Sequence, residues 1–159
     1  MTQAPRRSPV AEPGFEVRLA ESFARQAAMA TLGARLGRVA PGEVELLMQH
    51  RAELTQQHGF LHAGIVATAL DSACGYAAFT LMPAHAAVLT VEFKINLIAP
   101  ARGPAFRFEG RVVKAGRTIS VVDGRALQSA ADGSGETESL VATMTATVMT
   151  VVGREGLRH

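Results

Sequence analysis

The stretch that decides the fold is HAGIVATALDSACGYAAF, residues 62–79, which is almost entirely small or apolar. Extended to Met82, it is long enough for a helix of about 20 residues and contains no Lys or Arg. Apolar residues fall on nearly all sides of such a helix, so it must be covered on nearly all sides. Its many alanines and the central Asp71 favour a helix enclosed by its own protein over a membrane span.

The residues after this helix are typical of strands. Within 88–98 (VLTVEFKINLI), apolar residues alternate with polar ones, which predicts one buried and one solvated face. The predicted buried set is Leu89, Val91, Phe93, Ile95 and Leu97. Further strands are predicted at 106–113, 118–130 and 140–152, and at 43–55 before the helix.

The first ordered segment is predicted to be a helix. Phe15, Leu19, Phe23 and Ala27 recur every four residues, and we expect one amphipathic helix that ends near Gly33 or Gly37. The fold class is therefore α+β. We expect an antiparallel sheet of five to six strands wrapped around the long central helix.

The composition predicts a single domain. The chain has 159 residues and 48% hydrophobic content, which is enough for one core. We expect residues 1–14 to be disordered, 15–152 to form the domain and 153–159 to form a tail, with a hairpin loop at 132–136 (DGSGE). A single cysteine and the lack of an apolar signal segment favour the cytoplasm.

The binding partners are predicted from the charge of the chain and from how much of the central helix one sheet can cover. The net charge is only +2, the arginines are scattered and there is no Trp, which argues against nucleic acid, and no segment indicates a membrane. One sheet covers only part of the helix at 62–82, so we expect a second copy to cover the rest and to pair an open sheet edge. This predicts a homodimer or a dimer of dimers.

Several catalytic signatures are absent from the sequence. It has no Gly-rich phosphate loop, no G-x-G-x-x-G, no G-x-S-x-G and no H-E-x-x-H. What remains is the junction QQHGFLHAG, residues 56–64, where Gly59 permits a tight turn and the helix starts after His62. The N–H groups around Ala63 and Gly64 have no partner within the helix and are suited to a developing oxyanion.

Asp71 is the second candidate feature. A carboxylate in an apolar helix is costly unless it is paired or used, so a purely structural Asp and a catalytic base are both open. Gly64 and Asp71 are separated by about 10 Å along one helix, too far to reach one carbonyl group. If they cooperate, the N–H donor and the carboxylate must come from different subunits.

These residues resemble a known family. A glycine, two residues, H-A-G and an Asp nine residues after the His are similar to the signature of hotdog-fold acyl-CoA thioesterases of the phenylacetate-degradation type. The strand VLTVEFKINLIAPA and the segment VVKAGRTISVVDGRAL also resemble that family, and the resemblance covers about residues 15–152.

The resemblance implies roles for three of the candidate residues. Asp71 is the base or the nucleophile, the Ala63 N–H polarises the thioester carbonyl, and Thr90 helps to place the water or the carboxylate. Gln56 stands where the family usually has Asn, and Ala63 where it favours Gly. The candidate catalytic residues are Asp71, Ala63, His62, Thr90 and Gln56, and the candidate substrate-binding residues are Gly64, Gly59 and Arg117.

The expected activity is hydrolysis of an aryl- or fatty-acyl-CoA, with CoA as part of the substrate and no metal or redox cofactor. The alternatives are a protein that binds acyl-CoA without hydrolysis and an enoyl-thioester hydratase, although a D-x-N-P-x-H stretch is missing. We expect His62 to orient the loop rather than transfer protons, Cys74 to be a buried apolar residue, and Glu92 to be the substitute base if Asp71 is structural.

Overall fold

The computed structural model describes residues 10–130 and 137–154. Most of the predicted disordered segment, the predicted hairpin loop at 132–136 and most of the predicted tail lie outside these residues. No helix in the described ranges is long and apolar enough to cross a membrane.

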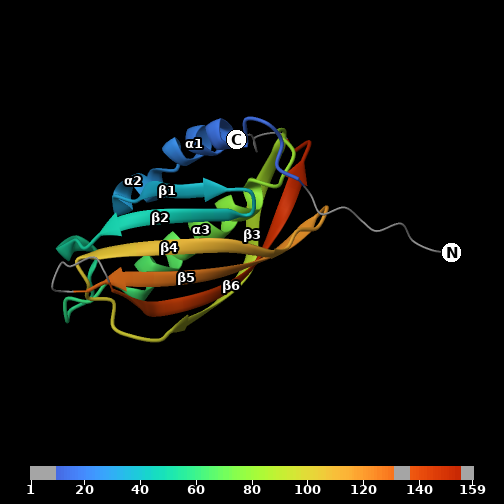
Figure 1. Cartoon of the computed structure of the whole chain (residues 1–159). Coiled ribbons are helices and arrows are strands. Elements are labelled where there is room, and N and C mark those ends of the chain that lie inside the picture. The colour runs from blue at the N-terminus through green and yellow to red at the C-terminus, as the bar shows by residue number, and fades with distance from the viewer. Residues whose placement is uncertain (1–9, 131–136, 155–159) are drawn as a thin grey trace.

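The core of the protein is one antiparallel sheet curved around one long helix (Figure 1). The sheet has six strands in the order β1-β2-β4-β5-β6-β3. Their bounds are β1 Arg35–Ala40, β2 Glu43–Gln49, β3 Ala86–Leu97, β4 Ala105–Lys114, β5 Ile119–Ser129 and β6 Glu138–Val152. Helix α3, Ala63–Phe79, packs on the inner face of the sheet. This is the hotdog fold that the sequence predicts.

Two glycines of the sheet let α3 approach closely. A Cβ atom at Gly110 would lie 2.3 Å from the carbonyl oxygen of Ala73, and one at Gly124 would lie 2.9 Å from the Cys74 sulfur. Ala73 and Cys74 of α3 are fully buried at these contacts. Small residues on both surfaces therefore bring the helix backbone against the sheet, which explains the alanine-rich composition of α3.

We expect Gly110→Ala to lower the free energy of unfolding by about 3 kcal/mol, because the new methyl group would meet the helix backbone rather than a flexible side chain. Urea unfolding measures the change. Gly75→Ala, on the helix itself, is the matched control, since its Cβ meets no atom within 4 Å. An unchanged urea midpoint for Gly110→Ala would show that the close approach of α3 is wrong.

The N-terminal region differs from the single predicted helix. It contains α1, Phe15–Ala24, and α2, Ala27–Leu32, with a break at Arg25 and Gln26. The predicted end near Gly33 is confirmed, because Gly33 takes the left-handed conformation after α2, with φ of 67°. The strand β1 that follows was not predicted: its burial does not alternate cleanly, so period-two patterning could not reveal it.

Polar side chains of α1 lie along α3. Arg18 Nη2 donates to the carbonyl oxygens of Phe79 and Met82, at 3.2 and 2.9 Å. One turn further on, Ser22 lies 3.3 Å from the hydroxyl of Tyr76. Helix α1 thus covers part of the α3 surface that the sheet leaves open, a role that the sequence assigned to a second subunit alone.

The predicted strand 43–55 is too long. Strand β2 ends at Gln49, and a 3-10 turn, η1 Ala52–Leu54, follows it. The alternating pattern holds only in the first half, where Val44, Leu46 and Met48 are buried. The end of β2 matters for the site because the chain then enters the loop before α3.

Strand β3 forms one edge of the sheet, and the uniform alternation predicted for it is wrong. The pairing with β6 shifts between Thr90 and Glu92, so that Thr90 lies opposite the buried Val148 while Glu92 lies opposite Thr147 on the outer face. The irregularity adds one residue, Val91, and exchanges the two faces of the strand beyond it. Thr90 is thereby turned toward α3.

The β3 edge exposes large apolar side chains. Val91, Phe93 and Leu97 are 56%, 44% and 54% exposed in the single chain. A long apolar edge strand is a surface that proteins cover or pair. These residues form the apolar edge, the name used below for this surface.

Candidate active site

The loop before α3 is held in a defined shape. Thr55 and Leu61 form an isolated bridge, and the Gly59 N–H donates to the carbonyl of Gln56 at 3.0 Å. Gly59 has φ of 80°, which only glycine adopts without strain, so the predicted tight turn is confirmed. His50 Nε2 also lies 3.0 Å from the Gly59 carbonyl oxygen.

His62 is the N-cap of α3. Its Nδ1 accepts a hydrogen bond from the Gly64 N–H at 2.9 Å, and a Cβ at Gly64 would approach that nitrogen to 3.2 Å. The Gly64 N–H is therefore already satisfied, which leaves Ala63 as the N–H donor of the first turn. Among the described residues, no acceptor is found for the Ala63 N–H.

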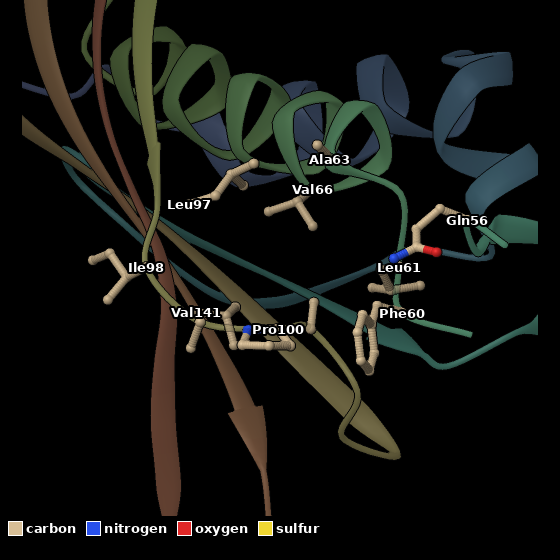
Figure 2. Close-up of a pocket in the computed structure, with 11 residues that line it drawn as sticks. Gln56, Phe60, Leu61, Ala63, Val66, Leu97, Ile98, Pro100 and Val141 are labelled. Carbon is tan, nitrogen blue, oxygen red and sulfur yellow. The ribbon is translucent and has the colours of Figure 1, made fainter. Parts of the chain in front are cut away.

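A pocket of about 370 Å³ lies beside the start of α3, and Ala63 is one of its lining residues (Figure 2). Its walls are mostly apolar and come from the loop, the start of α3 and the end of β3. The principal lining residues are Gln56, Phe60, Leu61, Ala63, Val66 and Leu97. We call it the donor pocket, because it is bordered by both Ala63 and Gln56.

The amide orientation of Gln56 follows from its neighbour. The His58 N–H donates to Gln56 Oε1, so the oxygen is held by the loop and the nitrogen is left for the pocket. Figure 2 shows the nitrogen turned toward the pocket and the oxygen turned away from it. The Ala63 N–H and the Gln56 amide together supply two hydrogen-bond donors at one pocket.

Asp71 lies on the open side of α3 rather than inside the core. It is partly exposed, and its Oδ1 accepts a hydrogen bond from the Thr90 hydroxyl at 2.7 Å. The carboxylate borders a second hollow of about 260 Å³, called the carboxylate hollow. It is lined by Gln26, Asp71, Ser72, Gly75, Tyr76, Val88, Leu89 and Thr90.

Within one chain, the predicted N–H donor and the predicted carboxylate lie in separate hollows. The donor pocket and the carboxylate hollow share no residue. Ala63 and Asp71 are separated by about 12 Å along the helix axis. Both hollows border β3, the first at Leu97 and the second at Leu89 and Thr90.

The other candidates lie apart from these two hollows. Glu92 is on the outer face of the sheet, where its Oε1 accepts from Thr147 at 3.1 Å, so it does not replace Asp71 beside α3. Arg117 lines a different hollow, near the C-terminal end of α3. Burial raises the pKa of the Cys74 thiol to about 12, which agrees with the predicted buried apolar role.

Sequence reasoning missed Gln26, Ser72 and Tyr76 in the carboxylate hollow. Gln26 Nε2 donates to Ser72 Oγ at 3.3 Å, from the break between α1 and α2 to the middle of α3. The available signal was the spacing of Arg18, Ser22 and Gln26, four residues apart beside the apolar stripe of α1. No three His, Cys, Asp or Glu side chains within the described part of the chain are arranged to hold a metal ion.

Comparisons with known proteins identify relatives that share this fold. A sequence model of the Thioesterase superfamily matches residues 58–130. A thioesterase family protein from Silicibacter pomeroyi, of known crystal structure, is 56% identical, covers 88% of this chain and 100% of its own, and superposes with a TM-score of 0.84. The PaaI protein of the E. coli phenylacetic acid degradation operon is 16% identical, with coverages of 91% and 98% and a TM-score of 0.78, and shows the fold alone.

Curated relatives match over a shorter range. A protein of Saccharolobus solfataricus that carries the provisional name of an esterase is 37% identical over 82 residues. The match covers 52% of this chain and 58% of the relative, so this chain spans less than two thirds of that relative's length.

Proposed function

Since the chain belongs to the thioesterase superfamily, we propose that it hydrolyses an aryl- or fatty-acyl-CoA thioester to the free acid and CoA. The observation that carries the proposal is the Asp71 carboxylate, which is held by Thr90 on one oxygen and opens onto a hollow beside β3, the edge strand of the described sheet. The aryl-acyl part rests on the resemblance of the motif around His62 to the phenylacetate-degradation type.

The apolar edge supports a site shared by two subunits. Antiparallel pairing of β3 with its copy would set the Leu97 end of one strand beside the Leu89 end of the other. The donor pocket borders Leu97 and the carboxylate hollow borders Leu89, so the donor pocket of one subunit would meet the carboxylate hollow of its partner. Each dimer then has two equivalent sites, and pairing also covers the exposed apolar side chains.

In the proposed mechanism, Asp71 is the general base. Thr90 occupies one carboxylate oxygen, and the other accepts a proton from water as the water oxygen attacks the thioester carbonyl carbon. The carbonyl oxygen becomes an oxyanion, which accepts hydrogen bonds from the Ala63 N–H and the Gln56 amide. The carbon–sulfur bond then breaks, and the CoA thiolate takes the proton from Asp71.

His62 positions the donor in this scheme. By capping Gly64 through Nδ1, it fixes the first turn of α3 and leaves the neighbouring Ala63 N–H directed out of the helix. Gly59 shapes the preceding loop, and Gly64 leaves room for the imidazole ring. Arg117 is assigned no contact with the reacting atoms.

A turnover screen tests the proposed function. Purified protein is mixed with acetyl-, hexanoyl-, palmitoyl-, benzoyl- and phenylacetyl-CoA, and released CoA is measured with a thiol reagent. We expect turnover at about 1–10³ per second for the best substrate. The Asp71→Asn variant measures the background release of CoA. Tight binding of these compounds without CoA release would instead identify a protein that binds acyl-CoA without hydrolysis.

A further inference from the structure

Gly75 lines the carboxylate hollow, and nothing in the described part of the chain requires a glycine there. A Cβ atom at Gly75 would meet no atom within 4 Å, whereas those at Gly110 and Gly124 would collide with α3. Its backbone is in the interior of α3 and is not among the glycines with positive φ. Neither packing against residues 10–130 and 137–154 nor the backbone conformation explains the glycine.

Glycine is unfavourable at such a position. It is the least favourable helix-interior residue apart from proline, because it loses the most backbone freedom when the helix forms. Alanine, abundant elsewhere in α3, would fit the backbone at no steric cost. The chain therefore leaves the volume in front of Gly75 empty although alanine at position 75 would make the helix more stable.

The empty volume lies close to Asp71, because Gly75 and Asp71 both line the carboxylate hollow. Gly75 follows Asp71 by one helical turn, so the two residues share a face and lie about 6 Å apart along the axis. Gln26 and Ser72 border the hollow on one side, and Val88 and Leu89 of β3 border it on the other.

We propose that Gly75 is the residue that sets the largest acyl group this chain accepts, because the missing side chain leaves room for that group beside Asp71. The proposal rests on the proposed thioesterase function and assigns the acyl group, rather than the pantetheine arm, to the carboxylate hollow. Bulk at position 75 shortens the acceptable acyl group while the reacting residues stay in place.

Gly75→Ala and Gly75→Val test this assignment. For Gly75→Ala we expect the melting temperature to rise by about 2–4 °C, since alanine favours the helix and meets no neighbour. We expect the ratio of kcat/KM for acetyl-CoA to that for hexanoyl- or phenylacetyl-CoA to rise about 10-fold or more. Gly75→Val should extend the loss to smaller acyl groups.

Val17→Ala is the matched control. Val17 is 63% exposed on α1, so this change also favours a helix but lies outside both hollows. It should leave the ratio of kcat/KM for acetyl-CoA to that for phenylacetyl-CoA as in the parent.

Binding of non-hydrolysable S-ethyl- and S-hexyl-CoA thioethers gives the same comparison without turnover. If the parent hydrolyses nothing, the proposed function fails, while a size-dependent loss of thioether affinity in Gly75→Ala still supports this assignment. Equal losses for small and large groups, or an unchanged ratio, overturn it. A change of oligomeric mass in Gly75→Ala also overturns it, because the space would then belong to a second copy of the chain.

Discussion

Replacing Asp71 by Asn is expected to lower kcat by about 10²–10⁴-fold, the usual contribution of a general base. The Asn side chain has nearly the same shape, and its carbonyl oxygen can still accept the Thr90 hydroxyl that lies 2.7 Å from Asp71 Oδ1. It cannot accept a proton from water at neutral pH. The expected result is therefore loss of the chemical step with little change in KM, measured by steady-state release of CoA.

The Asp71 experiment has internal controls. Thr90→Ser keeps the hydroxyl that orients the carboxylate and should stay close to the parent, whereas Thr90→Val removes it and should lower kcat by a smaller factor than Asp71→Asn. Thermal unfolding should be nearly unchanged in Asp71→Asn, because Asp71 is partly exposed. Parental turnover by a folded Asp71→Asn protein would exclude Asp71 as the base.

Replacing Ala63 by Pro is expected to lower kcat by about 10²–10³-fold, the usual cost of removing one oxyanion donor. Ala63 is the first residue of α3, where proline is well tolerated, and the preceding His62 already has the extended conformation that proline requires, with φ of −61° and ψ of 138°. The substitution thus deletes the N–H without breaking the helix, and CoA release measures the loss.

Ala63→Gly is the matched control for the proline variant. It keeps the N–H and adds no bulk to the donor pocket, so its kcat should remain within about threefold of the parent. Circular dichroism of both variants should match the parent. If the proline variant is as active as the glycine variant, the Ala63 N–H does not stabilise the oxyanion.

The sequence was sufficient to predict the central helix and the sheet around it, because both have strong patterns. The continuous apolar run 62–79 predicts α3, and alternation together with strand-favouring composition predicts β4 to β6 closely. Features set by a single residue were not predictable in this way. The irregularity at Val91 in β3 exchanges the faces of the strand and leaves no mark in the composition.

The candidate site was likewise predictable only in part. Of the predicted site residues, Gln56 and Ala63 border the donor pocket. Asp71 and Thr90 border the carboxylate hollow, where the Thr90 hydroxyl donates to Asp71. Gln26 was not identified, because its contact with Ser72 joins segments 46 residues apart. Such long-range contacts depend on how α1 crosses α3, which local periodicity does not determine.

The central claim, that each site combines Asp71 of one subunit with the Ala63 N–H of its partner, is tested by mixing two inactive variants. Asp71→Asn and Ala63→Pro proteins are unfolded together in equal amounts, refolded and assayed for acyl-CoA hydrolysis. Random dimers should recover about a quarter of the parental activity, because each mixed dimer holds one site with both residues intact. Activity no higher than that of the separate variants, in a mixture shown to contain mixed dimers, would contradict the shared site.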